Sequence, residues 1–570
     1  MVGGQFNMRI LQFKEVMRAE RVAFTYFGES EPVLQPCSFC IKSGSVVLLA
    51  GGNGSGKTTL LKLMAGAMQS HEGQQQGELS CGMVKDGQAP IRGFILQEAK
   101  EQFVIGTVED ELAFAPENLG LPREVIHSRV EEQLDKADLR QLRLRQVQQL
   151  SGGEQQRTAV ASVLTMEPDV LLIDDAWSQM DKESRRRLLE QLQAWHSQGR
   201  TIVLAASRLD ELSDEWQHGW IQDAQLLLLH NGRMVYDGKM PVYPARDGLN
   251  GLSRPKDELR CLELCYEAGI ILPKWEGNAE TTIMSMQVPA TVKQGSAGDD
   301  AAVRAECAGG EYSRILEEEV LLHLSKVSYR YHPIAHRDQK RRQTEDALHN
   351  VTFQLKAGRC MLLTGKNGSG KSTLFRLITG GLSKRSGSME GEWWIAGQLG
   401  QKLRSSEVAR LIGFTAQQPE SGFFAASVQE ELRDALHAAN QCGRLRIEGQ
   451  SWEGHAVYTH EQVEREVESR LQQYCLWEVK HLHPHDMPTG LKRLLSLAIA
   501  SAHEPEVILL DEPTASLDAV HAAFVRDWCL RQAEQGRALI VATHDRMWEE
   551  VEHPRLMHAN MNRGSLHINL

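Results

Sequence analysis

Two glycine-rich octapeptides could each hold the phosphates of a nucleotide. Residues 51–58 read GGNGSGKT and residues 365–372 read GKNGSGKS. In such a loop the backbone N–H groups face the phosphates, because glycine allows a close approach, and the lysine reaches the outermost phosphate groups. Each octapeptide lies between a strand-like apolar run and a helical run, at 46–50 and 60–64 for the first and at 361–364 and 374–378 for the second. Both octapeptides therefore have the strand-loop-helix context that a P-loop requires.

A second apolar strand ends in two acidic residues in each half of the chain. Residues 170–175 read VLLIDD and residues 507–512 read VILLDE. Strands of this kind, called Walker B strands, carry a carboxylate that holds Mg²⁺ beside a P-loop. Because each half has one P-loop and one such strand, the chain contains an internal repeat. We call the two halves copy one and copy two.

A hexapeptide just before the first Walker B strand carries a family resemblance. Residues 150–155 read LSGGEQ, which resembles the signature of the ABC ATPase family, and the resemblance covers nearly the whole chain. It implies an α/β fold with two tandem P-loop ABC ATPase domains. Each domain would have a RecA-like core, an antiparallel β-subdomain and a helical subdomain, and the two would pack head to tail. The implied reaction is hydrolysis of ATP with Mg²⁺ as cofactor.

The resemblance assigns binding roles in both copies. Gln97 and Gln417 resemble Q-loop glutamines, Tyr26 and Tyr331 resemble adenine-stacking aromatic residues, and Asp181 and Asp518 resemble D-loop aspartates. The expected ATP-binding residues of copy one are Tyr26, Gly51, Asn53, Gly54, Ser55, Gly56, Lys57, Thr58, Thr59, Gln97 and Asp174. Those of copy two are Tyr331, Gly365, Lys366, Asn367, Gly368, Ser369, Gly370, Lys371, Ser372, Thr373 and Asp511. The signature residues of this set are Ser151, Gly152, Gly153 and Glu154. The expected Mg²⁺ ligands are Thr58, Gln97, Ser372, Gln417 and Asp511, with Asp174 on the far side of the ion in copy one.

The catalytic residues that the resemblance implies are complete only in copy two. In family members a glutamate follows the Walker B aspartate and polarises the attacking water, and a later histidine contacts the γ-phosphate. Copy two has both, so its expected catalytic residues are Glu512, His544, Gln417 and Lys371.

The spacing of the repeat shows what copy one lacks. His544 follows Asp511 by 33 residues, and the residue 33 positions after Asp174 is Ser207. Asp175 stands where copy two has its glutamate, and its side chain is one methylene shorter. This withdraws the carboxylate by roughly 1 Å, and a misplacement of that size can cost about 10²-fold in rate.

The signature is altered in copy two instead. At the spacing that separates Ser151 from its Walker B strand, copy two has Pro488, within the run MPTGL at 487–491. Proline has neither an N–H group nor a hydroxyl, and Thr489 adds a β-branched side chain where copy one has glycine. A helix can still begin here, since proline fits a first turn. Donors for a γ-phosphate have been lost.

These losses fall in one place if the domains pack as family members do. Each ATP then lies between the P-loop of one domain and the signature of the other, so the P-loop of copy one faces residues 488–490 and that of copy two faces residues 151–153. One site would be competent and one degenerate. Random drift in an inactive paralogue would have scattered the changes over both sites.

Two segments of copy one resemble the ATPase subunits of energy-coupling-factor importers, which take up vitamins and transition-metal ions. They are residues 102–122 and residues 259–273, whereas copy two departs from the pattern. The resemblance implies two partners, a transmembrane coupling subunit and a small substrate-binding membrane protein. A helix of the coupling subunit would enter the groove near the Q-loops. The expected location is the cytoplasmic face of the membrane, with no direct membrane span.

The expected domains follow from these segments and from composition. They are ABC ATPase domain 1 at 1–245, its helical C-terminal extension at 246–283, a flexible linker rich in glycine, alanine and serine at 284–312, and ABC ATPase domain 2 at 313–570. Two additions in copy two, at 337–342 and 441–460, are interpreted as solvated loops.

Composition narrows the class of protein. A net charge of −12 opposes attraction to nucleic acid, and the ten scattered cysteines fit reduced structural thiols. The sequence shows no run long enough to span a bilayer and no secretory signal. Two alternatives to the importer remain. The first is a tandem ABC ATPase that acts on ribosomes or nucleic acid, which would need a long charged linker or metal-binding cysteines. The second is a regulator that binds ATP without hydrolysing it, which would need two defective sites.

Overall fold

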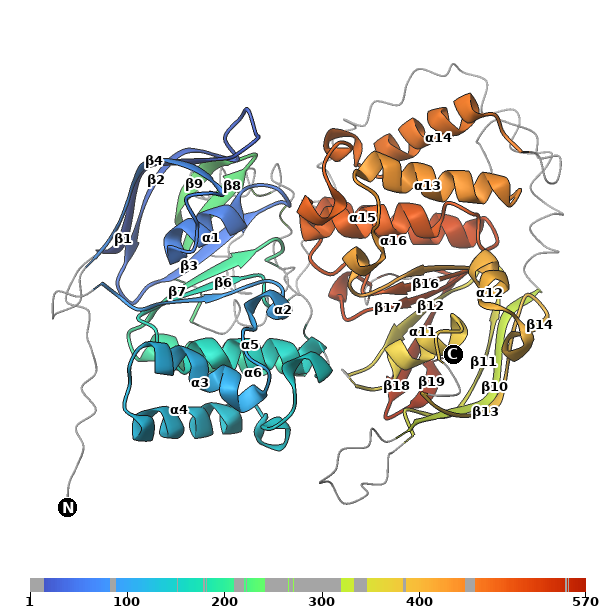
Figure 1. Cartoon of the computed structure of the whole chain (residues 1–570), viewed down its shortest axis with the longest axis horizontal. Coiled ribbons are helices and arrows are strands. Elements are labelled where there is room, and N and C mark those ends of the chain that lie inside the picture. The colour runs from blue at the N-terminus through green and yellow to red at the C-terminus, as the bar shows by residue number, and fades with distance from the viewer. Residues whose placement is uncertain are drawn as a thin grey trace, which may run out of the picture. The chain divides into compact units, whose positions relative to one another are not determined.

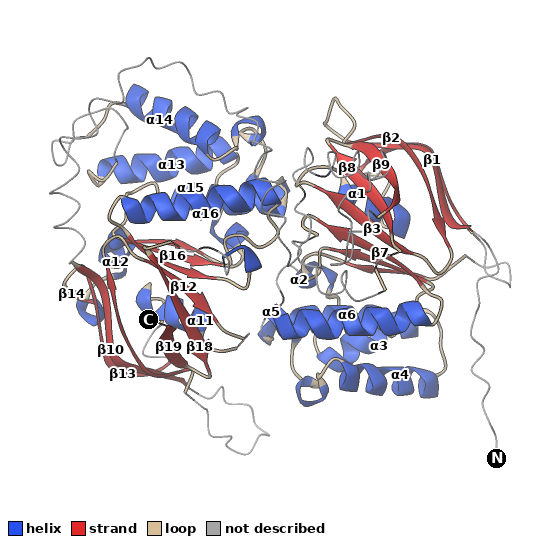
Figure 2. Cartoon of the chain, turned by 180° about the vertical axis from the view of Figure 1, so that it is seen from behind, coloured by secondary structure: helices blue, strands red, loops and turns tan. Residues whose placement is uncertain are grey.

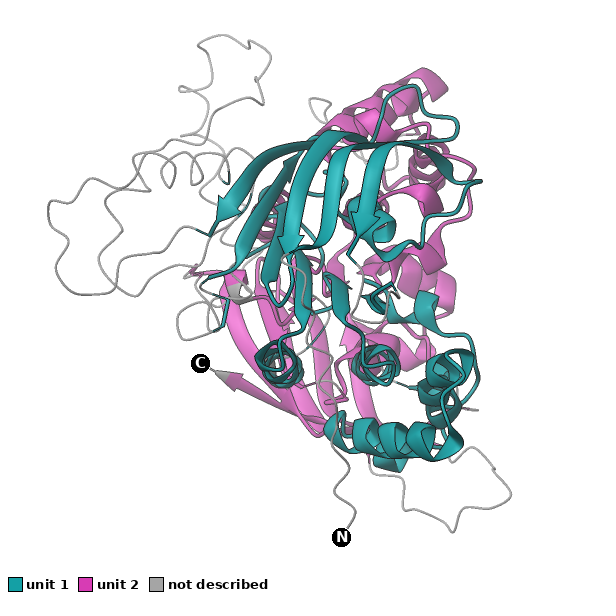
Figure 3. Ribbon diagram, turned by 90° about the vertical axis from the view of Figure 1, so that its left-hand side faces the viewer, with its two compact units in different colours: residues 1–277, 516–520 teal, residues 278–515, 521–570 magenta. Residues whose placement is uncertain are grey.

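The chain divides into two compact units, which are coloured separately in Figure 3. They are residues 1–277 with 516–520, and residues 278–515 with 521–570. The computed structural model describes residues 15–82, 89–150, 152–177, 180, 182–209, 220–221, 223–240, 265, 270, 319–332, 346–366, 368–382, 386–445, 457–548, 551 and 553–569. The predicted site residues Ser151, Asn367 and Asp181 lie outside the described residues, as do the predicted linker at 284–312 and the addition at 337–342.

The first unit begins with an antiparallel sheet of order β2-β1-β4 (Figure 1). Its strands are β1 (Glu15–Tyr26), β2 (Leu34–Lys42) and β4 (Gly73–Cys81). Buried and exposed residues alternate along β2, which is the pattern of a sheet with one face against a core. That core includes Phe24, Phe39 and Leu60, so the sheet packs on the helix after the first P-loop.

The main sheet of this unit has the order β5-β6-β7-β3-β8-β9. Its strands are β3 (Val46–Gly51), β5 (Arg92–Ile95), β6 (Val170–Asp174), β7 (Thr201–Ala206), β8 (Gln225–His230) and β9 (Arg233–Lys239). All pairs are parallel except β8 with β9. Every residue of β3, β6 and β7 is buried, which explains their continuous apolar sequences. The P-loop and the Walker B acids lie at the carboxyl ends of β3 and β6, two parallel strands that flank β7 in this sheet.

The helices of the first unit contribute to two layers, one that packs on the sheets and one that consists of helices alone (Figure 2). They are α1 (Lys57–Ala65), α2 (Ala99–Gln102), α3 (Val108–Asn118), α4 (Arg123–Lys136), α5 (Gly152–Leu164) and α6 (Lys182–Ser197). Helices α3, α4 and α5 share a small core of their own, in which Leu112, Leu134 and Ala161 are buried. Thr107 caps α3, because its hydroxyl accepts a hydrogen bond from the Asp110 amide at 3.3 Å.

The second unit repeats both sheets. The antiparallel sheet has the order β11-β10-β13-β14 and the main sheet has the order β15-β16-β17-β12-β18-β19. Their strands are β10 (Val320–Tyr331), β11 (Leu348–Lys356), β12 (Cys360–Thr364), β13 (Gly387–Ile395), β14 (Gln398–Leu399), β15 (Ile412–Thr415), β16 (Val507–Asp511), β17 (Ala538–Ala542), β18 (Leu556–Asn562) and β19 (Ser565–Asn569). The final pair, β18 with β19, is antiparallel like its counterpart in the first unit.

The helices of the second unit follow the same plan. They are α11 (Lys371–Ile378), α12 (Ser405–Leu411), α13 (Val428–Gln441), α14 (His460–Gln473), α15 (Thr489–Ala500) and α16 (Ala519–Glu534). Helix α13 packs against both α14 and α15, as Figure 2 shows. Leu432 and Leu436 of α13 and Val467 of α14 are fully buried.

The predicted α/β fold with two P-loop cores is confirmed, and each core carries an antiparallel sheet and a helical layer. The two predicted strand-loop-helix contexts are β3 to α1 and β12 to α11. The proposed domain boundaries stay predictions, since of the 246–283 extension the structure describes Cys265 and Ile270 alone, both buried in the core of the first unit. Within the described residues, none of the helices has the length and apolar character needed to cross a membrane.

Candidate functional site

The P-loop of copy one curves around its own lysine. Gly56 has φ 97°, a left-handed conformation that favours glycine, and α1 begins at the next residue, Lys57. The Lys57 ammonium group donates hydrogen bonds to the carbonyls of Gly51 at 2.8 Å and Gly52 at 2.9 Å. Burial lowers the pKa of Lys57, and the nearby Asp174 carboxylate opposes that shift. The Lys57 ammonium group is thus held beside the first two residues of the P-loop.

The P-loop of copy two has the same geometry. Gly370 has φ 112°, and α11 begins at Lys371, whose ammonium group donates to the Gly365 carbonyl. A Cβ atom on Gly365 would lie 2.2 Å from the Met561 carbonyl oxygen. Only glycine fits here, because backbone approaches backbone too closely for any side chain.

Two buried hydroxyls indicate how well the loops would fit a phosphate ligand. Ser55 Oγ and Ser369 Oγ are buried, and neither has a hydrogen-bond partner among the described residues. They occupy equivalent positions of the two octapeptides. A buried hydroxyl without a partner is unfavourable by about 1–3 kcal/mol, so a polyphosphate that accepted these hydrogen bonds would fit both loops.

A hydroxyl and a buried carboxylate meet beside each P-loop. Ser372 Oγ donates to Asp511 Oδ2 at 3.3 Å, and the Thr58 hydroxyl makes the same contact with Asp174. Burial raises the pKa of both aspartates above the ordinary value, with opposing contributions from the nearby lysine and hydroxyl. Oxygen ligands with a desolvated carboxylate suit a small divalent cation such as Mg²⁺, which would restore the ionised form.

Glu512, His544 and Lys371 lie together in copy two. The Lys371 ammonium nitrogen is 3.0 Å from His544 Nε2. The His544 amide donates to Glu512 Oε2 at 3.2 Å, and His544 Nε2 is 3.7 Å from Glu512 Oε1. Glu512 is only 8% exposed, and burial raises its pKa to about 7, with Lys371 opposing the shift. A carboxylate with this pKa is suited to act as a general base near neutral pH.

Copy one keeps the turn but not these side chains. Asp175 and Glu512 both follow the Walker B strand in a left-handed conformation, with φ 44° and 50°, which is uncommon for residues other than glycine. Their amides donate to equivalent carbonyls, Ala205 at 3.2 Å and Ala542 at 2.8 Å. Ser207, in the position of the histidine, instead approaches Asn53 Oδ1 with its hydroxyl at 3.5 Å. The difference between copies therefore lies in the side chains, because the backbone is the same.

The signature helices begin as the sequence predicts. Helix α5 begins at Gly152, with Gly153 buried and Glu154 half-buried. In copy two Pro488 is the N-cap of α15, with φ −53° and no side-chain cap, and its carbonyl accepts from the Lys492 amide at 3.1 Å. The altered signature thus retains a regular helix start and lacks a hydroxyl at the cap.

Arg493 makes a contact with Glu512 that could not be predicted from the motifs in the sequence. It projects from α15, is 5% exposed, and donates through Nη1 to the backbone carbonyl of Glu512 at 2.7 Å. The equivalent residue of copy one is Gln156, so a comparison of the two copies could have revealed the difference. Arg493 connects the altered signature helix of copy two to the residue with the raised pKa in the same unit.

The remaining predicted residues lie at the edges of the two loops. The Tyr26 hydroxyl lies 3.1 Å from Thr59 Oγ1, and the Tyr331 hydroxyl lies 3.3 Å from Thr373 Oγ1. The tyrosines are half-buried at the ends of β1 and β10, beside the P-loop helices. Gln97 and Gln417, also half-buried, follow β5 and β15. Gly54, Gly368 and Lys366 complete the described parts of the loops, and Lys366 lies with its carbonyl 3.5 Å from the Lys371 ammonium group.

Comparison with known proteins agrees with this geometry. A family model described as ABC transporter matches residues 34–178 and again residues 348–515. A Bacillus anthracis protein provisionally named ABC transporter ATP-binding protein is 28% identical over 92% of this chain and 87% of its own length. A Streptomyces coelicolor protein with the same provisional name is 29% identical over 93% of this chain and 90% of its own length.

A third relative carries a more specific name. It is a Bacillus subtilis protein provisionally named HMP/thiamine import ATP-binding protein, 27% identical over 94% of this chain and 88% of its own length. The two family matches together cover more than half of the chain, each across a P-loop and a Walker B strand. With two ATP-binding domains in tandem, the chain is an ATPase that belongs to the ABC transporter family.

Proposed function

We propose that this chain is the ATP-hydrolysing subunit of an importer of the energy-coupling-factor type, with one competent and one degenerate ATP site. The observation that carries the asymmetry is the cluster of Lys371, Glu512 and His544 in copy two, where copy one has Asp175 and Ser207 at the equivalent positions. The transported substrate would be a vitamin or a transition-metal ion.

The chemistry of the competent site follows from Glu512. Its ionised carboxylate would accept a proton from the water that attacks the γ-phosphate, and the His544 amide would fix the carboxylate while this occurs. Lys371 and the backbone amides of residues 365–370 would bind the phosphates, and Ser369 would gain the partner that its buried hydroxyl lacks. Tyr331 would stack on the adenine.

Mg²⁺ is the cofactor that the hydroxyl and carboxylate pairs would hold. Ser372, Asp511 and Gln417 would hold it in copy two, and Thr58, Gln97 and Asp174 in copy one. When bound, the ion neutralises charge on the phosphate oxygens. The raised pKa of the buried Asp174 and Asp511 supports this assignment, because an adjacent cation would favour the ionised form of both groups.

The competent site would be completed from copy one. We propose a head-to-tail arrangement in which Ser151, Gly152, Gly153 and Glu154 face the nucleotide of copy two. The P-loop of copy one would then face Pro488 and Thr489. Its nucleotide would be bound by Lys57 and hydrolysed slowly or not at all, because Asp175 is short and Ser207 replaces the histidine.

Two exposed apolar side chains support a membrane partner near the Q-loops. Val104 is 67% exposed and Phe424 is 89% exposed, and each lies seven residues after its Q-loop glutamine. A single exposed apolar residue needs no explanation, so the support lies in the recurrence of this exposure at equivalent positions of both copies. We infer that a transmembrane coupling subunit docks here, at the cytoplasmic face of the membrane, together with a separate substrate-binding membrane protein. The provisional import name of the Bacillus subtilis relative is consistent with this inference.

Photo-crosslinking tests the membrane partner. A benzophenone side chain placed at Val104 or Phe424 should capture an integral membrane protein in cells that make the natural membrane proteins. The same group at Val125, which is 38% exposed on α4, is the control and should capture less. Capture of ribosomal or nucleic-acid-binding proteins at both positions would favour the alternative, a tandem ABC ATPase that acts on ribosomes or nucleic acid.

A further inference from the structure

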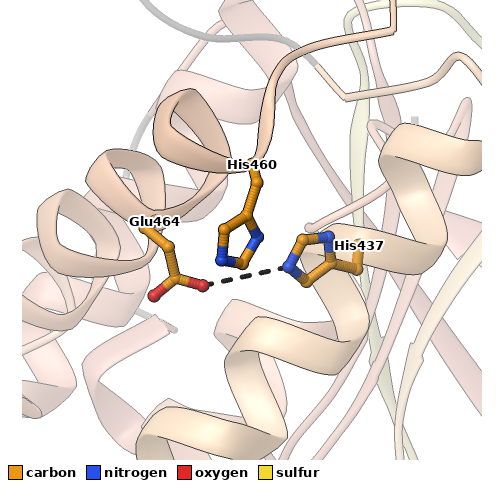
Figure 4. Close-up of side chains that lie close together, drawn as sticks. All are labelled: His437, His460 and Glu464. Atoms are coloured by element: carbon orange, nitrogen blue, oxygen red, sulfur yellow. Dashed lines mark ion pairs between the residues drawn. The ribbon is translucent and has the colours of Figure 1, made fainter.

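A group of potential metal ligands lies outside both ATP sites, in the helical layer of the second unit. His437 projects from α13, and His460 and Glu464 project from α14 (Figure 4). One ligand atom from each residue lies within 4.8 Å of the other two, and His437 Nε2 is 3.8 Å from Glu464 Oε1. The two imidazole rings are nearly parallel, with centroids 5.3 Å apart.

The helices place these side chains in a chelating pattern. His460 and Glu464 are four residues apart on α14, so they lie on one face of that helix. The third member comes from α13, which packs against α14. Two nitrogen or oxygen ligands of one tetrahedral ion lie roughly 3.4 Å apart, given metal–ligand distances of about 2.1 Å. The observed separations need small rotations of side chains on a half-exposed surface to reach that value.

The start of α14 is fixed beside this group. Thr459 caps the helix, and its amide and hydroxyl exchange hydrogen bonds with Gln462 in a capping box. The Asn440 side chain, at the end of α13, bonds both the amide and the carbonyl of Tyr458, at 2.8 and 2.9 Å. The backbone positions of His437 and His460 are therefore determined by contacts other than their own rings.

Arg433 is the competitor for the carboxylate. It donates to both oxygens of Glu464, at 2.7 and 3.0 Å, and lowers the pKa of that carboxyl. The carboxylates of Glu430 and Asp434 also lie near Arg433 and raise its pKa together with Glu464. Acidic groups thus outnumber this one cation, so a divalent ion would enter a region whose local charge is not repulsive.

We propose that His437, His460 and Glu464 form a binding site for a divalent transition-metal ion that joins α13 to α14. Two imidazoles and one carboxylate favour Zn²⁺, Co²⁺, Ni²⁺ or Cu²⁺ over Mg²⁺ and Ca²⁺, which prefer oxygen ligands alone. The exposure of His460 leaves room for water as a further ligand. The role is structural, because the ion would fasten the chain on either side of the connection between the two helices.

Titration of the purified, untagged full-length chain with Co²⁺ tests the proposal. Binding should produce the visible d–d absorption of a nitrogen- and oxygen-ligated ion, and H437Q and H460Q should each weaken it at least about tenfold. Zn²⁺ should raise the melting temperature of the wild-type chain and not that of H437Q. Retention of Co²⁺ affinity in both variants would overturn the proposal, as would the absence of any Co²⁺ binding by the wild-type chain.

His127 provides the matched control. It lies four residues before Glu131 on α4, with His127 Nε2 4.0 Å from Glu131 Oε1, so it has the same helical pair as α14 but no third ligand among the residues that the structure describes. H127Q should leave Co²⁺ affinity unchanged. R433Q should keep or increase the affinity, because it releases Glu464. A tenfold loss in R433Q would contradict the assignment of Glu464 as a ligand.

Discussion

The backbone amide of His544 donates a hydrogen bond to Glu512 Oε2 at 3.2 Å, and the ring of the same histidine lies 3.7 Å from Oε1. One residue in the segment that follows β17 therefore holds the carboxylate that follows β16. Copy one has the same two strands and the same left-handed turn, but Asp175 and Ser207 replace the two side chains. Under the proposed function, in which Glu512 is the proton acceptor, the asymmetry between the copies concerns the positioning of that group.

Removal of the two carboxylates should have unequal effects. Glu512→Gln should reduce steady-state ATP turnover by about 10²- to 10⁴-fold, the usual range for loss of a general base. Asp175→Asn should reduce it far less, because its copy has serine in the position of the histidine. Steady-state ATPase assays on both variants measure the difference. Asp175→Glu is the control and should not create a second fast site, since Ser207 and the altered signature remain. Equal losses in Glu512→Gln and Asp175→Asn would contradict the asymmetric model.

The pH dependence of hydrolysis should report on Glu512. Burial raises its pKa to about 7, and only the ionised form can accept a proton. The value of kcat/KM should therefore increase about tenfold per pH unit below pH 7 and level off above it. The residual activity of Glu512→Gln should lack this transition, which ATPase assays between about pH 5.5 and 8.5 would show. A wild-type profile that is flat through this range would mean that the carboxylate is not the proton acceptor.

The same raised pKa predicts a stability difference. The folded chain binds the Glu512 proton more tightly than the unfolded chain, whose value is near the ordinary 4.5. The stabilising contribution is fully present below about pH 4.5 and is lost as the pH rises through about 7. Glu512→Gln cannot ionise, so its advantage in free energy of unfolding over the wild-type chain should be small at about pH 5. It should grow to at most about 3 kcal/mol above pH 8. Thermal unfolding of the nucleotide-free proteins at the two pH values measures this difference.

Much of the fold could be predicted because the informative residues act locally. Glycines at residues 51–56 and 365–370 and the buried runs of β3, β6, β12 and β16 determine strand, loop and helix within one segment each. The repeat also allowed one copy to serve as a reference for the other, which identified Ser207 and Pro488 by spacing alone.

The rest depends on contacts between distant segments. Arg493 lies in an amphipathic helix where its side chain could equally have faced solvent, and only the packing of α15 against β15 and α13 brings it to the Glu512 carbonyl. The group of His437 and Glu464 likewise joins two helices separated by a polar addition whose length gives no indication of pairing. Neither contact has a local sequence pattern.

Arg493→Gln should weaken the competent site without removing any group that touches the nucleotide. The Arg493 guanidinium bonds the Glu512 carbonyl at 2.7 Å and lowers the pKa of the Glu512 carboxyl. The variant places in copy two the residue that copy one has at this position. Its kcat should fall by roughly tenfold, the equivalent of one lost charged hydrogen bond, and the pH transition in kcat/KM should move upward. The neighbouring variant Lys492→Gln is the control and should show neither effect. An unchanged pH transition in Arg493→Gln would limit this residue to a role in packing.

The head-to-tail arrangement should be detectable through the signature of copy one. If Ser151 completes the site that contains Glu512, Ser151→Ala should lower turnover although it lies in the other half of the chain. Loss of one donor to the γ-phosphate can cost about 10²- to 10³-fold in kcat. The matched variant Pro488→Ala lies at the equivalent position of copy two and would face the degenerate site, so its effect should be less than about twofold by the same reasoning. The combined variant Ser151→Ala with Glu512→Gln should be little slower than Glu512→Gln alone, because both residues act in one site and their effects should not be additive. If Pro488→Ala were the more damaging single variant, each signature would serve the P-loop of its own copy, and the shared site would have to be abandoned.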